Sequence, residues 1–218
     1  MANIVVVDYH KGNLMSVKRG LEAAGASVFV SDDPAALAQA DAAVLPGVGS
    51  FADASAFMRE SGQLDALRAF VAQGKPFLGI CLGMQLLFEY GEEGAGPEGP
   101  AEGLGIFKGT CRRLDARGLK VPHVGWNDIA KTPQAGPLFE GVPDGFHFYF
   151  THSYAVDPAE TDVVACRTEY GTVFPSAVAR GAAFGCQFHP EKSSKLGHEV
   201  LGNFVRFVDA CVQKGADR

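Results

Sequence analysis

The first eighty residues alternate between short apolar runs and amphipathic segments, and this alternation constrains the fold more than any other feature of the chain. Apolar runs typical of buried strands lie at Asn3–Asp8, Val28–Ser31, Ala42–Leu45 and Pro76–Ile80. Segments with helical spacing separate them, at Asn13–Ala24, at Ala35–Ala40 and in the stretch that ends at Gln73. Repeated strand–helix units predict a mostly parallel sheet with helices on both faces.

The second half of the chain lacks this regular alternation. A helix is predicted at Met84–Tyr90, and a mobile surface loop at Gly91–Gly103, which is rich in glycine, proline and glutamate. An amphipathic helix is predicted at Ser193–Gln213, and no repeat or linker interrupts what we expect to be a single domain over residues 1–218. Between these segments, short apolar runs predict strands added to the sheet as hairpins, at Gly109–Leu114, Val121–Ile129, Phe146–Tyr154, Val163–Glu169, Ser176–Ala179 and Ala183–Phe188.

Charge and cysteine content exclude several classes of function. The net charge is −6 and no run of Lys or Arg exceeds two residues, so no basic face for nucleic acid or an anionic membrane is expected. The start of the chain lacks the features of a signal peptide, and the five cysteines are widely spaced and odd in number. We therefore expect no disulfide framework, and we expect a cytoplasmic location. The six histidines show no metal-binding spacing, so no metal is expected.

A candidate nucleophile lies at Cys81, in the segment GICLG between an apolar strand and a helical segment. This is the pattern of a nucleophile elbow with Cys in place of Ser. Small neighbours permit the tight turn, and the following helix N-terminus favours a thiolate and a developing oxyanion. The alternative is a buried core cysteine whose flanking glycines serve close packing.

A candidate base and a candidate orienting group follow the run Ala183–Phe188. In extended chain, His189 and Glu191 point to the same side while Pro190 stiffens the link between them. They would stand at the carboxyl end of a strand, where open α/β sheets place their sites. The alternative is a surface turn with an incidental ion pair. Cys186 has the opposite strand parity from His189 and is expected in the core.

The segment Pro46–Gly49 also follows a strand, and its glycines allow backbone amides to face an anion. This arrangement suits an oxyanion hole. Residues 47–52 also match the dinucleotide-binding pattern G-x-G-x-x-A. However, the pattern follows the third strand rather than the first, and no acidic residue stands at a strand end about 20 residues later. We therefore favour the oxyanion loop.

Six segments together give the chain a family resemblance. The segments GICLGMQ, QFHPEKS and PGVGSF resemble the class I, triad-type glutamine amidotransferases. The segments DYHKGNLMSV, VPHVGWN and FYFTHSY narrow the resemblance to the glutaminase subunits of imidazole glycerol phosphate synthases, along essentially the whole chain. The resemblance implies a flavodoxin-like, mostly parallel sheet flanked by helices, with added antiparallel strands in the second half. One departure is His10, which stands where these proteins usually have glycine.

The resemblance also implies roles for individual residues. Cys81 would be the nucleophile, His189 the base and acid, and Glu191 the group that orients His189. Gly47 and Val48 would form the oxyanion segment, with the amide of Leu82 as second donor. Glutamine would contact Gln85, Glu93, Ser153 and Tyr154. The surface for a partner, a (β/α)8-barrel cyclase, would include Asn13, Trp126, Asn127, Tyr149 and Lys192.

The function implied by the resemblance is hydrolysis of glutamine through a cysteine thioester, in a heterodimer that serves histidine biosynthesis. The ammonia would pass through the barrel to the cyclase, and no cofactor or metal is implied. Two alternatives remain at this point. One is the glutaminase of another synthase or a stand-alone γ-glutamyl hydrolase, and the other is a flavodoxin-like binding module without catalysis.

Overall fold

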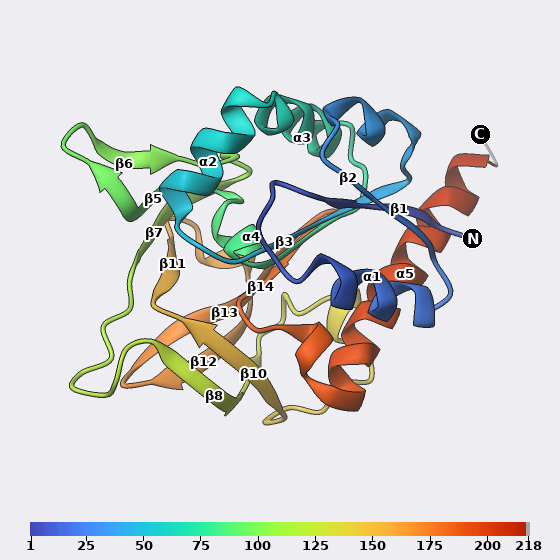
Figure 1. Ribbon diagram of the computed structural model, residues 1–218. Coiled ribbons are helices and arrows are strands. Elements are labelled where there is room, and N and C mark those ends of the chain that lie inside the picture. The colour runs from blue at the N-terminus through green and yellow to red at the C-terminus, as the bar shows by residue number, and fades with distance from the viewer. Residues whose placement is uncertain (217–218) are drawn as a thin grey trace.

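Residues 1–216, the part of the chain that the computed structural model describes, are arranged around an eight-stranded sheet (Figure 1). Five strands are parallel and follow the order β2 (Ser27–Ser31), β1 (Asn3–Val7), β3 (Ala42–Gly47), β4 (Phe77–Cys81) and β14 (Ala183–Cys186). Antiparallel strands extend the sheet beyond β14, in the order β13 (Thr172–Arg180), β12 (Val164–Tyr170) and β9 (Ala130–Lys131). This mostly parallel α/β arrangement confirms the predicted fold class.

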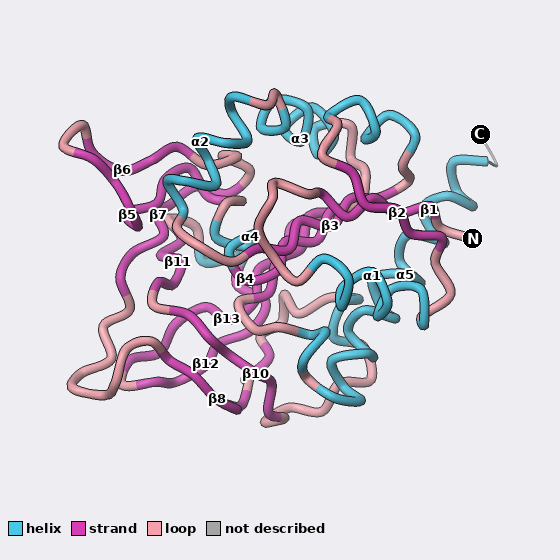
Figure 2. The backbone as a smooth tube through the Cα atoms, viewed as in Figure 1, coloured by secondary structure: helices cyan, strands magenta, loops and turns pink. Residues whose placement is uncertain are grey.

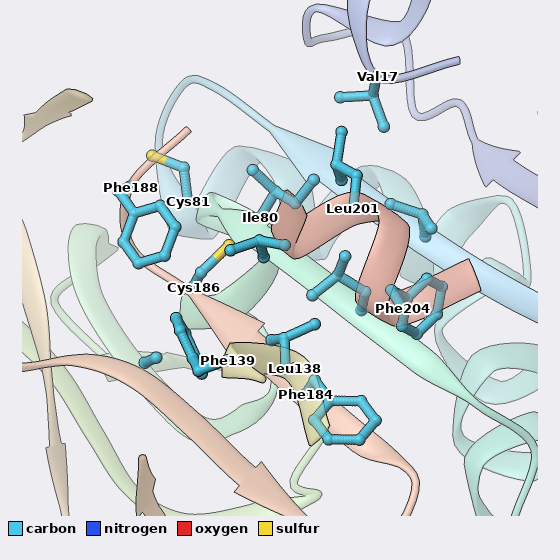
Figure 3. Close-up of a cluster of buried hydrophobic side chains, with 14 of the residues drawn as sticks. Val17, Ile80, Cys81, Leu138, Phe139, Phe184, Cys186, Phe188, Leu201 and Phe204 are labelled. Carbon is cyan, nitrogen blue, oxygen red and sulfur yellow. The ribbon is translucent and has the colours of Figure 1, made fainter. Parts of the chain in front are cut away.

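Helices cover both faces of this sheet, as Figure 1 shows. The strand β1 illustrates why, because alternate side chains point to opposite faces. Ile4 and Val6 join an apolar cluster with α1 (Leu14–Ala23) and α5 (Ser194–Ala216). Val5 and Val7 join a second cluster with α2 (Phe51–Glu60) and α3 (Gln63–Ala72). Figure 3 shows the first cluster, in which Val17 of α1 and Leu201 of α5 lie near Ile80 of β4.

Several short helices take the 3-10 form. The predicted helix at Ala35–Ala40 is the 3-10 helix η1 (Pro34–Gln39), which Asp33 caps by accepting from the N–H of Ala35 at 2.9 Å. The others are η2 (Pro137–Phe139), η3 (Thr161–Val163) and η4 (Pro190–Lys192). Within residues 1–216, no helix is long and apolar enough to cross a membrane.

Two smaller sheets lie beside the central one (Figure 2). The predicted strands Val163–Glu169, Ser176–Ala179 and Ala183–Phe188 do extend the central sheet, as expected. The other three predicted added strands lie in the smaller sheets, which corrects that part of the expectation. One sheet has the order β11 (Tyr154–Pro158), β7 (Phe107–Arg113), β5 (Phe88–Gly96) and β6 (Gly99–Glu102). The other pairs β10 (His147–His152) with β8 (His123–Asp128). The predicted strand Phe146–Tyr154 is in fact two strands in different sheets, and only Ser153 separates them.

The helix predicted at Met84–Tyr90 and the loop predicted at Gly91–Gly103 are both wrong. The helix α4 comprises only Leu82–Gln85, and the chain continues as the β5–β6 hairpin. The physical reason is a set of non-local hydrogen bonds. The carbonyl of Leu86 accepts from the N–H of Leu104, and the carbonyl of Leu87 accepts from Ile106 and Phe107. These acceptors are therefore not available to continue a helix.

The carboxyl ends of β3, β4 and β14 meet at one edge of the central sheet. Gly47 pairs with Cys81 across β3 and β4, and Ile80 pairs with Cys186 across β4 and β14. Parallel sheets place functional loops at this edge. The topology therefore brings the three chemistry-bearing segments of the sequence together.

Candidate active site

Cys81 occupies a strained turn between β4 and α4. Its φ is 54°, a left-handed value that costs a non-glycine residue roughly 1–3 kcal/mol. A Cβ on Gly79 would lie 2.5 Å from the carbonyl oxygen of Gly83, and a Cβ on Gly83 would lie 1.7 Å from the carbonyl oxygen of Leu45. The two glycines are therefore required by contact between backbones, and the surrounding packing holds the Cys81 turn in place.

His189 and Glu191 form a buried pair beyond the end of β14. Nδ1 of His189 lies 2.9 Å from Oε1 of Glu191, and their side chains are 3% and 1% exposed. Burial lowers the pKa of His189, but the Cys81 sulfur and the Glu191 carboxylate outweigh this effect and raise the pKa to about 10. Nε2 of His189 is also buried and has no hydrogen-bond partner among the described residues. That nitrogen is the one left to exchange a proton with the thiol.

The strand β10 holds this pair against the nucleophile. The backbone N–H of His189 donates to the carbonyl of Tyr149 at 2.9 Å. The hydroxyl of Ser193 donates to the carbonyl of His189 at 2.6 Å and accepts from the N–H of Tyr149 at 3.0 Å. Further along β10, the carbonyl of Thr151 accepts from the Cys81 thiol at 3.9 Å. One strand therefore contacts both members of the predicted nucleophile–base couple.

An open cavity of about 490 Å³ lies over Cys81. Its walls are the Val48–Ser50 loop, the start of α4, Glu93 of β5 and the crossing from β10 to β11. His189 and Glu191 are buried behind Cys81, and neither lines the cavity. The predicted site residues that do line it are Val48, Cys81, Leu82, Gln85, Glu93, Ser153 and Tyr154.

Gln85 is oriented by the protein in a way that fixes its chemistry. Its amide Nε2 donates both to the carbonyl of Tyr154 and to Oε1 of Gln187, at 3.0 Å each. Because both amide protons are used, Gln85 presents only its carbonyl oxygen as an acceptor. Gln187 in turn directs its own Nε2 at the sulfur of Cys81, 3.6 Å away.

The predicted oxyanion segment packs against Tyr9. A Cβ on Gly47 would lie 2.0 Å from the hydroxyl of Tyr9, so this position admits only glycine. Burial and the nearby Cys81 raise the pKa of that hydroxyl, while the backbone N–H of Val48 lowers it, so all three groups are close together. The Tyr9 hydroxyl has no hydrogen-bond partner in residues 1–216. His10, beside it, adopts a left-handed φ of 63°, a backbone conformation that favours glycine.

Comparison with known proteins decides the family. The chain matches the family model described as glutamine amidotransferase class-I over residues 5–207. The chain belongs to the class I glutamine amidotransferases. It is 49% identical to the imidazole glycerol phosphate synthase subunit HisH of Moorella thermoacetica, over 95% of this chain and 96% of that protein. The corresponding subunit of Symbiobacterium thermophilum is 48% identical, over 95% of both chains.

A solved structure with low sequence identity shares the fold of this amidotransferase. PurLQS from Thermotoga maritima superposes with a TM-score of 0.71 at 21% identity, over 95% of this chain and 97% of that one. The fold is therefore shared by proteins with little sequence in common.

The remaining predicted residues of this amidotransferase fall into distinct settings. Burial and Asp53 raise the pKa of Glu93, and the N–H of Phe51 lowers it, so Glu93 lies at the start of α2 as well as on the cavity. Trp126 is 53% exposed and its ring centroid lies 6.1 Å from that of Tyr149.

Lys192 lies over the ring of Tyr149, with Nζ 5.8 Å from its centroid. Asn127 is turned inward, because its Nδ2 donates to the carbonyl of Glu169 at 2.9 Å. Asn13 precedes α1 and makes no side-chain cap. Of the five predicted partner residues, Trp126, Tyr149 and Lys192 form one surface cluster, in which Trp126 and Lys192 are exposed and Tyr149 is half-buried.

Three residues of the amidotransferase site were not found from the sequence, namely Tyr9, His152 and Gln187. Gln187 has a sequence signal, because it lies two positions before His189 and so shares its side of an extended chain. His152 lines the cavity and Tyr9 is buried beneath Gly47, and neither role follows from local spacing. Among residues 1–216, no group of three His, Cys, Asp or Glu side chains is arranged to hold a metal ion.

Proposed function

We propose that this amidotransferase is the glutaminase subunit of an imidazole glycerol phosphate synthase, which hydrolyses glutamine and passes the ammonia to a cyclase subunit. The observation that supports the chemistry best is the strained Cys81 turn beneath an open cavity, backed by the buried pair His189–Glu191. The identity of the synthase is supported by the relatives, which are named as HisH subunits at 49% and 48% identity along nearly the whole chain.

The first half of the reaction forms a thioester. His189 holds the proton of the thiol, and the Cys81 sulfur attacks the side-chain carbonyl carbon of glutamine. The carbonyl π electrons move to oxygen and form a tetrahedral oxyanion. The carbon–nitrogen bond then breaks as His189 transfers its proton to the departing nitrogen, which releases ammonia and leaves a γ-glutamyl thioester. Glu191 keeps Nδ1 of His189 occupied, so Nε2 is the nitrogen that exchanges the proton.

The second half hydrolyses the thioester. A water molecule loses a proton to His189 and attacks the thioester carbonyl carbon, and collapse of the second oxyanion expels the sulfur. The products are glutamate and the free enzyme. Gly47, Val48 and the amide of Leu82 are proposed to stabilise both oxyanions, because Val48 and Leu82 line the cavity beside Cys81 and Gly47 pairs with Cys81 across β3 and β4.

Recognition of glutamine follows from the cavity walls. We expect the Gln85 carbonyl oxygen to accept an N–H of the substrate, because its own amide protons are bonded to protein. Glu93 is proposed to meet the substrate α-ammonium, and the Ser153–Tyr154 segment to meet its α-carboxylate. All of these residues line the same cavity as Cys81.

The surface around β8 supports a protein partner. Val124 and Trp126 of β8 are 56% and 53% exposed, and Trp126 joins Tyr149 and Lys192 in the surface cluster. Large exposed apolar side chains gathered on one face are typical of interaction sites. We propose that a (β/α)8-barrel cyclase covers this face, with Asn13 and Asn127 at the same interface.

The chemistry is tested by glutaminase kinetics of Cys81→Ala with Cys186→Ala as the matched control. Both cysteines are buried, but Cys186 is 0% exposed within the apolar cluster and has no place in the reaction. We expect Cys81→Ala to abolish glutamate release while circular dichroism shows a native fold, and Cys186→Ala to retain activity. Comparable activity in Cys81→Ala and wild type would refute the assignment of the nucleophile.

The partner is tested by measuring kcat of the chain alone, with the cyclase, and with the cyclase plus its nucleotide ligand. The glycines beside Val48 allow its peptide plane to rotate, and a missing oxyanion donor costs about 10²–10³ in rate. We therefore expect a low rate for the chain alone and a rise well above 10-fold in the full complex. Equal kcat in all three mixtures would show that the cyclase does not activate this glutaminase. Stimulation by the synthase of a different pathway instead would reassign the partner.

A further inference from the structure

Two buried histidines connect the exposed strand β8 to the wall of the glutamine cavity. His123 of β8 and His152 of β10 are directly opposite each other in the antiparallel pair, and Nδ1 of His123 lies 3.0 Å from Nε2 of His152. At one end, Nδ2 of Asn127 lies 3.4 Å from Nε2 of His123. At the other end, Nδ1 of His152 lies 2.8 Å from the carbonyl oxygen of Tyr154. The four residues form a continuous hydrogen-bonded chain.

The direction of every hydrogen bond in this chain is determined from the cavity end. The carbonyl of Tyr154 can only accept, so Nδ1 of His152 carries its proton and Nε2 of His152 accepts. Nδ1 of His123 must then be the donor, which leaves Nε2 of His123 as an acceptor.

The surface end requires the same assignment independently. Oδ1 of Asn127 accepts from the N–H of Asp128 at 2.9 Å, so the other side of the amide is the donor Nδ2 facing His123. Both rings are therefore neutral with the proton on Nδ1. Each residue donates to the next one toward the cavity, from Asn127 at the surface to the Tyr154 carbonyl.

The setting of the two rings favours these neutral forms. His123 and His152 are 3% and 5% exposed, and His123 stacks on Tyr170 with ring centroids 4.0 Å apart. Burial lowers the pKa of His123 to about 4. Burial lowers the pKa of His152 to about 3. The hydrogen bond to the carbonyl of Tyr154 raises this pKa, and the nearby His123 and His189 lower it further. Neither ring gains a proton at neutral pH, so the direction of donation along the four hydrogen-bonded residues does not change.

The chain ends on the carbonyl that orients Gln85. The Tyr154 oxygen accepts both from Nδ1 of His152 and from Nε2 of Gln85, and Gln85 continues through Gln187 to the sulfur of Cys81. At its other end the chain begins on the inner side of β8, whose outward side chains are Val124 and Trp126. Among the strands of residues 1–216, β8 pairs only with β10, which carries His152. The hydrogen bond between the two histidines therefore joins β8 to the cavity wall.

We infer that His123 and His152 are positioning residues, which set the Tyr154 carbonyl and hence the orientation of Gln85 according to the position of β8. This inference rests on the proposed glutaminase function. Neither histidine is assigned a contact with the reacting atoms.

The test compares three variants by glutaminase kinetics in the complete complex. His123→Ala removes the donor to His152 and leaves a buried acceptor unpaired, so we expect KM for glutamine to rise about 10-fold with kcat within about threefold of wild type. His123→Asn places an amide N–H where Nδ1 was and should return KM to within about threefold. Thr168→Val is the matched control, because the buried Thr168 hydroxyl also ties β8 to its surroundings, by donating to the carbonyl of Asp128 at 2.8 Å outside the histidine chain.

The outcomes separate positioning from general loosening of the strand. An unchanged KM in Thr168→Val together with rescue by His123→Asn would support the inference. An equal rise of KM in Thr168→Val, or a loss confined to kcat in His123→Ala, would overturn it. So would His123→Asn behaving like His123→Ala.

A spectroscopic measurement tests the chain without using the enzymatic activity. Long-range ¹H–¹⁵N correlation spectra of the free protein at pH 7 should show both rings in the Nδ1–H tautomer. An Nε2–H tautomer at either ring would overturn the inference even if the enzyme is a glutaminase. Conversely, absence of glutaminase activity in the wild-type complex would refute the proposed function. The tautomers would still show whether the four residues are hydrogen-bonded as described.

Discussion

The contact that holds the nucleophile turn in place can be tested by a single methyl group, in the variant Gly83→Ala. A Cβ at Gly83 would lie 1.7 Å from the carbonyl oxygen and 2.8 Å from the carbonyl carbon of Leu45. Both are backbone atoms of the central strand β3, so no side-chain rotation relieves the overlap. Because real Cβ contacts essentially never fall below 3.0 Å, α4 and β3 must separate by at least about 1.3 Å.

This displacement sets the expected magnitudes. Overpacking of a rigid core typically costs about 1–3 kcal/mol, and the rigid backbone on both sides favours the upper end of that range. The helix propensity of alanine returns at most about 1 kcal/mol, so we expect the free energy of unfolding to fall by about 2 kcal/mol. The amide of Leu82 and the sulfur of Cys81 sit on the same turn. A shift of about 1 Å there is expected to lower kcat/KM by about 10²-fold.

The assay combines urea unfolding followed by circular dichroism with glutaminase kinetics in the complete complex. Gly20→Ala in α1 is the matched control, because its Cβ would meet only Cδ1 of Leu201 at 2.6 Å, at the end of a flexible side chain. We expect this control to change stability by less than about 1 kcal/mol and to leave activity unaltered. If Gly83→Ala unfolds at the wild-type urea concentration and retains kcat/KM within about threefold, the packing argument for the elbow is refuted.

Three further predictions concern the polar groups around the nucleophile. Because the pKa of His189 is raised to about 10, the protonated ring should stabilise the fold fully below about pH 6.5, and this stabilisation should be lost as the pH rises through 10. The unfolding free energies of wild type and His189→Gln should therefore converge between about pH 6.5 and 10. A difference that stays constant over this interval would contradict the assignment. Gln187→Leu removes the donor to the Cys81 sulfur and should lower kcat/KM about 10-fold, with a wild-type value counting against its role. Tyr9→Phe removes a buried hydroxyl that has no hydrogen-bond partner in residues 1–216, so the free energy of unfolding should rise by about 1 kcal/mol and the urea midpoint with it. A lower urea midpoint would show that the hydroxyl is hydrogen-bonded.

Local sequence patterns determined the parallel half of the fold. The strands β1 to β4 and the helices between them were predicted because burial on both faces leaves continuous apolar runs, and amphipathic helices leave a 3.6-residue period. The elbow at Cys81 and the pair His189–Glu191 were also predicted, because the residues that signal them lie within a few positions of each other. Periodicity and turn chemistry are short-range properties, so a sequence records them directly.

The segment from Leu82 to Glu102 shows where short-range information fails. Its apolar start resembles a helix and its glycine-rich continuation resembles a loop, but the structure forms only the short helix α4 and then the β5–β6 hairpin. The deciding hydrogen bonds join Leu86 and Leu87 to residues 104–107. A competing partner almost twenty residues away has no local signature.

The contacts around the reacting sulfur were decided by the tertiary structure alone. Gln187 is 106 residues from Cys81, and His152 is 29 residues from His123, yet each pair is within hydrogen-bonding reach. Tyr9 follows β1 and packs against Gly47 at the end of β3, where it excludes every side chain. A sequence states which donors and acceptors a chain carries, whereas the assembled sheets determine which of them meet, because burial removes water as an alternative partner and leaves each polar group to the neighbour that the fold supplies.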